Sequence, residues 1–150
     1  MKAVIQRVSK ASVTVDGELV SKINKGYLIL LGVMDDDTEE DAEILARKTS
    51  ALRVFEDADG KMNLDIQNVD GEILAVSQFT LCADLKKGNR PSFINAGSPA
   101  LAEELYEYTK EKCKSIFGKV ECGQFGADME VSLVNDGPFT LVLDSKELLN

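Results

Sequence analysis

The feature that most constrains the fold is a continuous apolar run, Tyr27-Leu28-Ile29-Leu30-Leu31-Gly32-Val33, which begins directly after Gly26. Its length is typical of a β-strand rather than of a helix. In a strand without alternating polar residues, both faces carry apolar side chains, so both faces must be covered by other parts of the protein. The run therefore predicts a central strand that lies between other layers of the fold.

Other strands are expected on either side of this run. Asp16-Gly17 is a strong hairpin signal and lies between strand-like segments at 11–15 and 18–23. A further strand-like run covers residues 72–81, and residues 119–143 predict short strands around an Asp-Gly-Pro turn. These segments predict a mainly antiparallel sheet.

Two helices interrupt the strands. The acidic segment 35–41 is conceivable as a metal loop, but it lacks the spacing and the glycine of an EF-hand. A helix start, with Thr38 as the cap and Asp41 three residues later, fits better. Ser98-Pro99 begins a second helix that we expect to end near Ile116. This order of elements predicts an α+β fold with a mainly antiparallel, barrel-like β core and two principal helices packed on it.

Composition limits the chemistry. The chain has 150 residues, a length that favours one domain over 1–150, with 17 basic and 26 acidic residues and a net charge of −9. This charge disfavours non-specific binding to nucleic acid, although it leaves room for a small basic patch. There is no histidine, which removes Ser-His-Asp and Cys-His catalytic arrangements and histidine-ligated zinc. No other metal-ligand cluster is visible, so we expect no metal and no cofactor.

The cysteines and the apolar runs indicate the compartment. Cys82, Cys113 and Cys122 are odd in number and form no CxxC pair, as expected of free buried thiols in a reducing environment. The N-terminus has no long apolar region, and no apolar run approaches 18 residues. We therefore expect a cytoplasmic protein without a secretory signal or a membrane span.

Three segments have a composition that suggests chemistry. Ser77-Gln78-Phe79-Thr80 places polar side chains at the end of an apolar strand, either where the strand emerges into solvent or at the floor of a polar pocket. Lys86-Lys87-Gly88-Asn89-Arg90 gathers three positive charges, which suits a solvated loop or a contact with RNA phosphates. Asn135-Asp136-Gly137-Pro138 is ordinary turn chemistry. Its Gly-Pro corner could instead offer main-chain carbonyls to an ammonium group, a recognition that does not depend on the ligand's side chain.

These segments, in this order, resemble the D-aminoacyl-tRNA deacylase family over nearly the whole chain. The motifs that carry the resemblance are Gln6-Arg7-Val8, Gly60-Lys61-Met62-Asn63, Ser77-Gln78-Phe79-Thr80-Leu81, Gly88-Asn89-Arg90-Pro91-Ser92-Phe93, Phe125-Gly126-Ala127-Asp128-Met129 and Asn135-Asp136-Gly137-Pro138-Phe139-Thr140.

The resemblance implies a cytoplasmic homodimer that hydrolyses the ester between a D-amino acid, or glycine, and the 3′ end of tRNA. In the family a cis Gly-Pro corner, here Gly137-Pro138, reaches into the partner subunit's pocket, holds the substrate's amino group and excludes L side chains. The residue matching Arg7 supports that corner. Phe125 and Met129 match positions near the adenosine and the pocket wall.

The resemblance also suggests how an ester could be cleaved without histidine. Backbone N–H groups near Phe79 and Thr80 are candidates for an oxyanion site, with Ser77 in the pocket and Gln78 as its anchor. Thr80 could act as a nucleophile, but the sequence supplies no evident base for it. The preferred alternative is that the 2′-OH of the terminal adenosine assists and Thr80 only orients. We infer that Lys86, Lys87 and Arg90 lie near the acceptor end of the tRNA.

Two other functions stay open at this point. A nucleic-acid-binding module without catalysis is one, although the net charge and the lack of a basic tail argue against it. A general small-molecule esterase is the other, and it would need a nucleophile–base pair that this sequence does not supply.

Overall fold

Strand β3 (Gly26–Gly32) lies inside the main sheet, as the apolar run predicts. A computed structural model describes residues 1–150. Tyr27, Ile29 and Leu31 pack into one hydrophobic cluster, and Leu28 packs into a second cluster on the opposite face. Both faces of β3 are therefore covered, and the expectation of a central strand is confirmed.

The main sheet has six strands in the order β2-β1-β3-β6-β7, and β8 pairs with β1 off this path. β1 is antiparallel to β2, β3 and β8, whereas β3, β6 and β7 are parallel neighbours. The two ends of the path curl so that β2 contacts β6 and β7. The strands of this sheet are β1 (Lys2–Val15), β2 (Glu18–Ile23), β6 (Glu72–Ser77), β7 (Val120–Cys122) and β8 (Glu130–Asp144).

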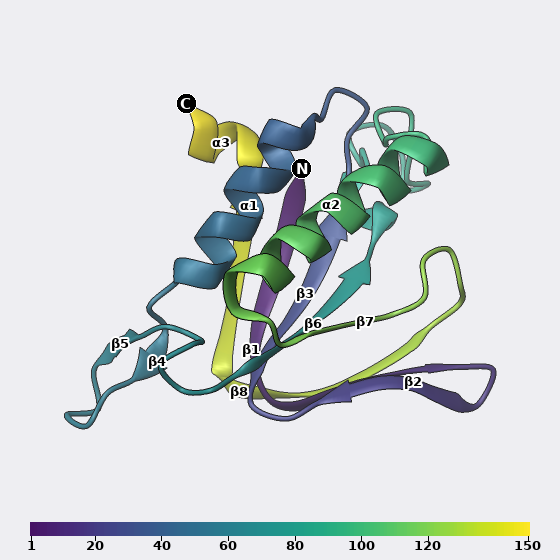
Figure 1. The fold of residues 1–150 in the computed structure, drawn as a ribbon. Coiled ribbons are helices and arrows are strands. Elements are labelled where there is room, and N and C mark those ends of the chain that lie inside the picture. The colour runs from purple at the N-terminus through teal and green to yellow at the C-terminus, as the bar shows by residue number, and fades with distance from the viewer.

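Parallel neighbours need a crossover connection, and the two long helices provide it. α1 (Glu39–Ala51) lies between β3 and β6 in the chain, and α2 (Pro99–Phe117) lies between β6 and β7. Both helices cover the same face of the sheet (Figure 1). The larger cluster of 18 buried residues fills the space under them. The predicted α+β class and barrel-like β core are confirmed, with two parallel pairs among the mainly antiparallel ones.

The helix starts follow the predicted signals. The carboxylate of Asp41 accepts a hydrogen bond from the Thr38 N–H at 2.9 Å. Ser98 Oγ accepts one from the Leu101 N–H at 3.2 Å, with Pro99 in the first turn of α2. A third, five-residue helix, α3 (Ser145–Leu149), was not expected from the sequence and packs beside α1 (Figure 1).

Two predicted strand regions differ from the structure. The run 72–81 is a strand only to Ser77, after which Phe79–Cys82 forms a 3₁₀ turn, η1. In the region 119–143, β7 is short as predicted. The part around the Gly-Pro sequence is not two short strands, because β8 continues through it for 15 residues. The β1–β8 ladder continues on both sides of that sequence, so the turn residues bulge out of one strand instead of joining two.

Smaller features complete the fold. β4 (Phe55–Glu56) and β5 (Met62–Leu64) form a hairpin that projects from the body of the molecule (Figure 1). Cys82 and Cys113 are buried free thiols, as predicted, whereas Cys122 is only partly buried. No helix is both long enough and apolar enough to cross a membrane.

Candidate active site

A pocket of about 520 Å³ opens where β6 ends, between the segment before β8 and the start of α2. It joins two of the motifs singled out in the sequence, which are almost fifty residues apart in the chain. Five predicted site residues line it: Ser77, Gln78, Phe79, Phe125 and Met129.

The floor of the pocket forms where β6 leaves the sheet. Ser77 is the last residue of β6 to pair with β3, and the Gln78 N–H then donates to the Leu31 carbonyl at 2.7 Å. The chain turns directly into η1, whose first two residues are Phe79 and Thr80. N–H groups in the first turn of a helix have no acceptor within the helix. The N–H groups of Phe79 and Thr80, which are the predicted oxyanion donors, therefore have no hydrogen-bond acceptor within η1.

Thr80 is exposed and does not line the pocket. Its hydroxyl accepts a hydrogen bond from the side-chain amide of Gln78. An amide is not a base, so this contact orients the hydroxyl without activating it.

The opposite wall consists of residues 125–129, which are apolar except for Asp128. The Phe125 ring packs against Tyr106 of α2, with ring centroids 5.8 Å apart. Tyr106 is buried, and its hydroxyl donates to the Ala75 carbonyl at 2.9 Å. Burial raises the pKa of Tyr106, so its hydroxyl stays protonated as a donor. At Gly123 a Cβ atom would lie 2.7 Å from the Met129 sulfur, so this glycine gives Met129 room in the wall.

The basic segment lies beside the pocket in the long loop that precedes α2. Asp84 and Ser92 form a two-residue antiparallel bridge, with hydrogen bonds of 2.8 and 3.0 Å. Lys86, Lys87 and Arg90 lie between them and are exposed. Phe93, which follows Ser92, packs edge-on against Phe79 with ring centroids 4.9 Å apart. Because Phe79 lines the pocket, this contact fixes the base of the basic loop to the pocket rim.

The Gly-Pro corner bulges out of β8. Gln6 pairs with Thr140 and Val8 pairs with Asn135. An advance of two residues along β1 therefore corresponds to five residues along β8, and the extra residues form the bulge. The residues between Asn135 and Thr140 have no partner in the ladder, and Gly137 and Pro138 are exposed. Their peptide bond is cis.

Gly137 has the conformation that its position requires. Its φ of +154° is rarely adopted by other residues, and a Cβ atom there would lie 2.7 Å from the Phe139 nitrogen. Glycine is therefore the residue that this corner accommodates without rearrangement.

Two side chains hold the corner from inside the fold. Arg7 Nε donates to the Asp136 carbonyl at 2.9 Å, and the guanidinium lies 4.7 Å from the centre of the Phe139 ring. Arg7 also donates to the Val54 carbonyl at 2.6 Å. Asn135 Oδ1 accepts from the Phe139 N–H at 2.6 Å. The structure therefore brings Arg7 to the corner.

The corner does not line the pocket of its own chain. No residue of the bulge, and neither Arg7 nor the basic residues of the loop, is among the pocket-lining residues. The pocket-lining residue nearest to the corner in sequence is Val131, which lies four strand steps of about 3.3 Å each from Asn135. The predicted site residues thus form three separate groups on one chain: pocket, basic loop and corner.

Sequence reasoning missed part of the pocket. Its remaining wall comes from Ala96 and Gly97 at the end of the long loop, and from Pro99 and Ala102 in the first turn of α2. The adjacent Ser98-Pro99 helix start was the available signal, but nothing in the sequence placed it beside Ser77. A second cavity of about 460 Å³ lies between β1, β2 and β8 and contains none of the predicted site residues.

Comparison with known proteins identifies the family. The family model described as D-Tyr-tRNA(Tyr) deacylase matches residues 4–144. The chain belongs to this family. Two relatives named D-aminoacyl-tRNA deacylase, from Caldicellulosiruptor saccharolyticus and Thermosipho africanus, are each 54% identical over 148 residues, or 99% of both chains. The family and the enzyme class expected from the sequence are thereby confirmed.

Solved structures share the architecture. A c-Myc DNA unwinding element binding protein has a TM-score of 0.91 and 44% identity, with 96% of this chain and 98% of that chain covered. A probable eukaryotic D-amino acid tRNA deacylase has a TM-score of 0.81 at 15% identity, covers 95% and 97% of the two chains, and shows the common fold alone.

Proposed function

We propose that this protein hydrolyses the ester bond of D-aminoacyl-tRNA, and of glycyl-tRNA, releasing the amino acid and tRNA. The observation that carries the proposal is the pocket that joins the 77–79 and 125–129 motifs of a family matched over residues 4–144. Aminoacyl-tRNA is an activated ester beside a ribose hydroxyl, so positioning and an oxyanion site can supply much of the rate acceleration.

The proposed chemistry uses the backbone at the pocket floor. The N–H groups of Phe79 and Thr80 stabilise the negative charge that develops on the carbonyl oxygen. The 2′-OH of the terminal adenosine assists the attack on the ester, and Gln78 fixes this end of the pocket. The hydrogen bond from Gln78 to Thr80 supports an orienting role for the Thr80 hydroxyl.

We further propose that a homodimer completes the site. The corner at Gly137-Pro138 is exposed and lies apart from the pocket of its own chain, which supports insertion into the pocket of a second copy. There its carbonyl groups accept hydrogen bonds from the substrate ammonium, while the space that an L side chain would need is filled. Glycine has no side chain and passes this filter.

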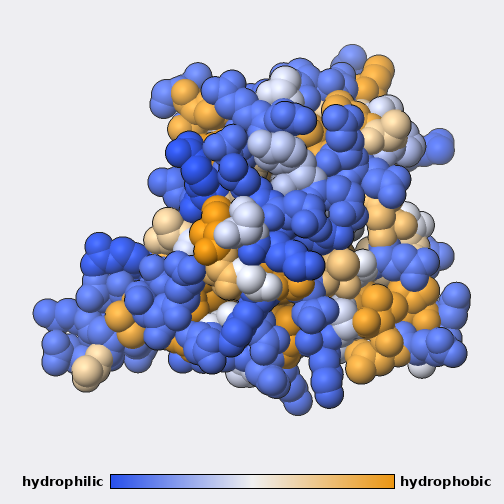
Figure 2. Space-filling view, viewed as in Figure 1, coloured by the Kyte–Doolittle hydropathy of each residue, from blue (hydrophilic) through white to orange (hydrophobic).

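Apolar residues suited to a dimer interface are exposed on β2 and on β8, the strand that carries the corner. The visible face of the molecule is largely hydrophilic, with hydrophobic atoms gathered beside the β2 hairpin (Figure 2). Burial of such residues would contribute about 25 cal/mol per Å² of apolar surface. The exposed residues on these strands are Leu19 and Val20 on β2 and Val134 and Val142 on β8, of which Val142 pairs with Val4 at the end of β8 far from β2.

The basic loop supplies the proposed contact with tRNA phosphates. Lys86, Lys87 and Arg90 are exposed in a protein of net charge −9, and Phe93 fixes the loop to the pocket rim. Because this contact neutralises few phosphates, we expect binding of tRNA to depend only moderately on salt. Translation quality control, acting as chiral proofreading in the cytoplasm, follows from this proposal as a prediction.

The decisive experiment uses tRNA charged with the D- or the L-form of the same amino acid. Release of free amino acid from the D-form, with the L-form left intact, is the expected result. Equal cleavage of both forms would refute the filter, and cleavage of neither would refute the proposed activity. A simple ester without RNA serves as the control and should stay intact.

One comparison favours a second candidate function, namely binding of DNA. The solved structure with 44% identity is named a DNA unwinding element binding protein. The net charge of −9 argues against general binding to duplex DNA. A gel shift on duplex DNA, carried out beside the deacylation assay, distinguishes the two functions.

A further inference from the structure

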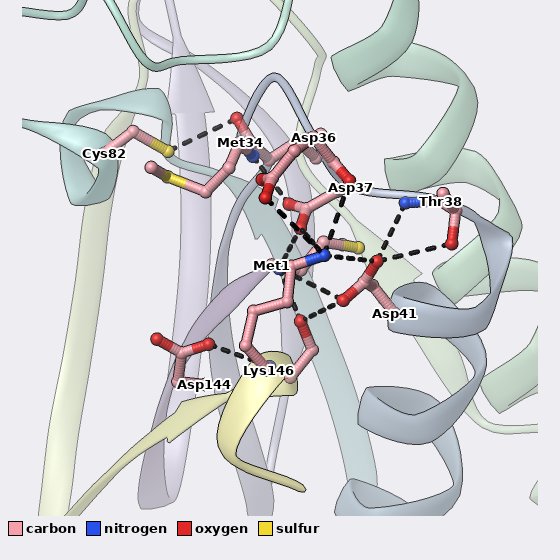
Figure 3. Close-up of polar contacts among 11 residues, drawn as sticks. Met1, Met34, Asp36, Asp37, Thr38, Asp41, Cys82, Asp144 and Lys146 are labelled. Carbon is pink, nitrogen blue, oxygen red and sulfur yellow. Dashed lines mark hydrogen bonds and ion pairs between the residues drawn. The ribbon is translucent and has the colours of Figure 1, made fainter. Parts of the chain in front are cut away.

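The amino terminus of the chain is buried in an ion-pair network (Figure 3). The α-ammonium group of Met1 donates to Asp37 Oδ1 at 2.6 Å and to Ser145 Oγ at 2.5 Å. It also lies 3.9 Å from Asp41 Oδ1. The side chains of Met1 and Asp37 are fully buried, and that of Asp41 is 2% exposed. A charged chain terminus without solvent is costly unless every charge is paired.

The network joins three separate parts of the chain, namely Met1, residues 37–41 and residues 145–146. Ser145 Oγ donates to Asp41 Oδ1 at 2.7 Å, so the same hydroxyl accepts from Met1 and passes a hydrogen bond to α1. Lys146 lies 3.1 Å from Asp41 Oδ2 and 3.5 Å from Asp37 Oδ1, but its side chain is 44% exposed. Two carboxylates therefore face two cations, of which only the Met1 ammonium is fully buried.

Hydrogen bonds favour the charged form of the Asp41 carboxylate. Burial by itself would raise the pKa of Asp41, but hydrogen bonds from Ser145, the Thr38 N–H and Lys146 outweigh it and lower the pKa to about 2. Asp41 is thus ionised at neutral pH and depends on its cationic neighbours.

Acylation of the Met1 amino group would dismantle this arrangement. A formyl or acetyl amide is uncharged and keeps one N–H donor, whereas the ammonium has three and already donates to Asp37 and Ser145. The added carbonyl group would also need space at a residue with no exposed surface. The fully buried carboxylate of Asp37 would lose its closest cation.

We propose that the Met1 amino group is a modification-sensitive site, and that a formyl or acetyl group on it strongly destabilises the fold. Hydrolysis of a formyl amide consumes one water, releases formate and leaves an amine, which takes up a proton to form the ammonium that Asp37 binds. Removal of a formyl group is then a maturation step for this protein.

The effect of acylation extends towards the pocket through the turn after β3. Asp37 Oδ2 accepts from the Met34 N–H at 2.6 Å, and Met34 pairs with Ala96. The Gly97 N–H donates to the Val33 carbonyl at 2.8 Å. Since Ala96 and Gly97 line the pocket, we expect loss of the ammonium to loosen this pocket wall as well as α3.

The test compares the protein with and without an N-formyl group, prepared in a bacterial host whose peptide deformylase is active or inhibited. Mass spectrometry verifies the two forms. We expect the formylated form to melt about 10 °C lower, as for a broken buried ion pair in a chain of this size. Amide exchange should rise at α3 and at residues 33–37. Equal melting temperatures and equal exchange would overturn the proposal.

Matched variants separate the role of charge from that of space. Asp37→Asn and Asp36→Asn make the same chemical change in the same turn, but the Asp36 side chain is 71% exposed. Formylation should cost much less in Asp37→Asn, where the ammonium has already lost its partner, and should keep its full effect in Asp36→Asn. An equal cost in both variants would overturn the role of the charge.

If the formylated form does not fold, chemical labelling tests the same proposal on the unmodified protein. An amine-reactive ester at neutral pH should label Met1 slowly in the folded protein and rapidly in urea. Asp37→Asn should increase the labelling rate in the folded state, and Asp36→Asn should not. Rapid labelling of Met1 in the folded wild-type protein would contradict the proposal.

Discussion

The pocket and the Gly-Pro corner both form where a strand leaves its ladder, yet they present opposite surfaces. β6 ends at Ser77 and turns inward through η1, so the side chains that follow line a hollow. β8 bulges outward between two parts of the β1 ladder, so Gly137 and Pro138 present their backbone to solvent.

This difference bears on what each region can recognise. In the mechanism that we propose, the hollow lined by Phe125 and Met129 is complementary in shape to a ligand, such as the base or ribose of a nucleotide. In the same proposed mechanism, a corner of main-chain carbonyls accepts hydrogen bonds from an ammonium group and does not depend on the side chain beside it. A filter for handedness that accepts many amino acids needs the second kind of surface, and binding of the tRNA end needs the first.

The largest expected effect comes from replacing the corner itself. Gly137-Pro138→Ala-Ala should reduce the preference for D- over L-substrate by about 100-fold or more, because a shift of about 1 Å in a positioning group can have that effect. The Cβ atom at residue 137 would meet the Phe139 nitrogen, so the backbone must move. Rates of amino-acid release from matched D- and L-aminoacyl-tRNA measure the change.

The corner variant should still form the proposed homodimer, as size-exclusion chromatography beside the wild-type protein can verify. Unchanged selectivity in a dimeric variant would remove the filter role and leave the corner as an ordinary bulge.

A smaller loss is expected when the support of the corner is removed. Arg7→Ala loses the hydrogen bonds to the Asp136 and Val54 carbonyls, and we expect kcat/KM for D-substrate to fall about tenfold, as for a lost hydrogen bond from a charged donor. Arg7→Lys keeps the charge but cannot make both contacts, so it should rescue only in part.

The kind of loss distinguishes positioning from stability. Selectivity should fall in Arg7→Ala at a temperature where circular dichroism shows a folded protein. If activity follows only the folded fraction, then Arg7 stabilises the fold and does not position the corner.

The third effect concerns the pocket rim rather than either recognition surface. Neutralising Lys86, Lys87 and Arg90 together should raise KM for aminoacyl-tRNA several-fold with little change in kcat, because we propose that these side chains contact phosphates and not the ester. The slope of log K against log salt concentration should become shallower by about 2, for three lost contacts to a single strand. An unchanged slope would place the tRNA elsewhere on the surface.

The same contrast explains what the sequence could predict. The β3 run, the Asp16-Gly17 hairpin and both helix starts depend on neighbouring residues, and all were predicted correctly. The end of β6 at Ser77 and the continuity of β8 depend on pairing with β3 and β1, which local patterns do not encode.

The candidate site follows the same division. The residues of the 77–79 and 125–129 motifs were named from the sequence, but their meeting in one pocket results from the crossover through α2. Ala96 and Gly97 carry no chemical signal and were missed. The buried Met1 network was missed because a terminal ammonium is not a side-chain motif, and its partner Ser145 is 144 residues away.

The smallest expected effect is at Thr80, and it tests how the pocket floor works. Thr80 is exposed, lies outside the pocket lining, and accepts its hydrogen bond from the Gln78 amide. No base contacts its hydroxyl in the structure, and the backbone N–H groups that we propose as oxyanion donors survive a change of side chain. Thr80→Ala should therefore keep kcat within about threefold of wild type, because only an orienting hydrogen bond worth about 0.5–1 kcal/mol is lost.

A nucleophile would behave differently, since its removal would lower the rate to near that of the uncatalysed reaction and the wild-type enzyme would form a trapped acyl-enzyme. Single-turnover kinetics on D-aminoacyl-tRNA, with mass spectrometry of the quenched protein, separates the two. The matched substrate ending in 2′-deoxyadenosine sharpens the result: if the ribose hydroxyl assists the attack, this substrate should lose activity equally in wild type and in Thr80→Ala.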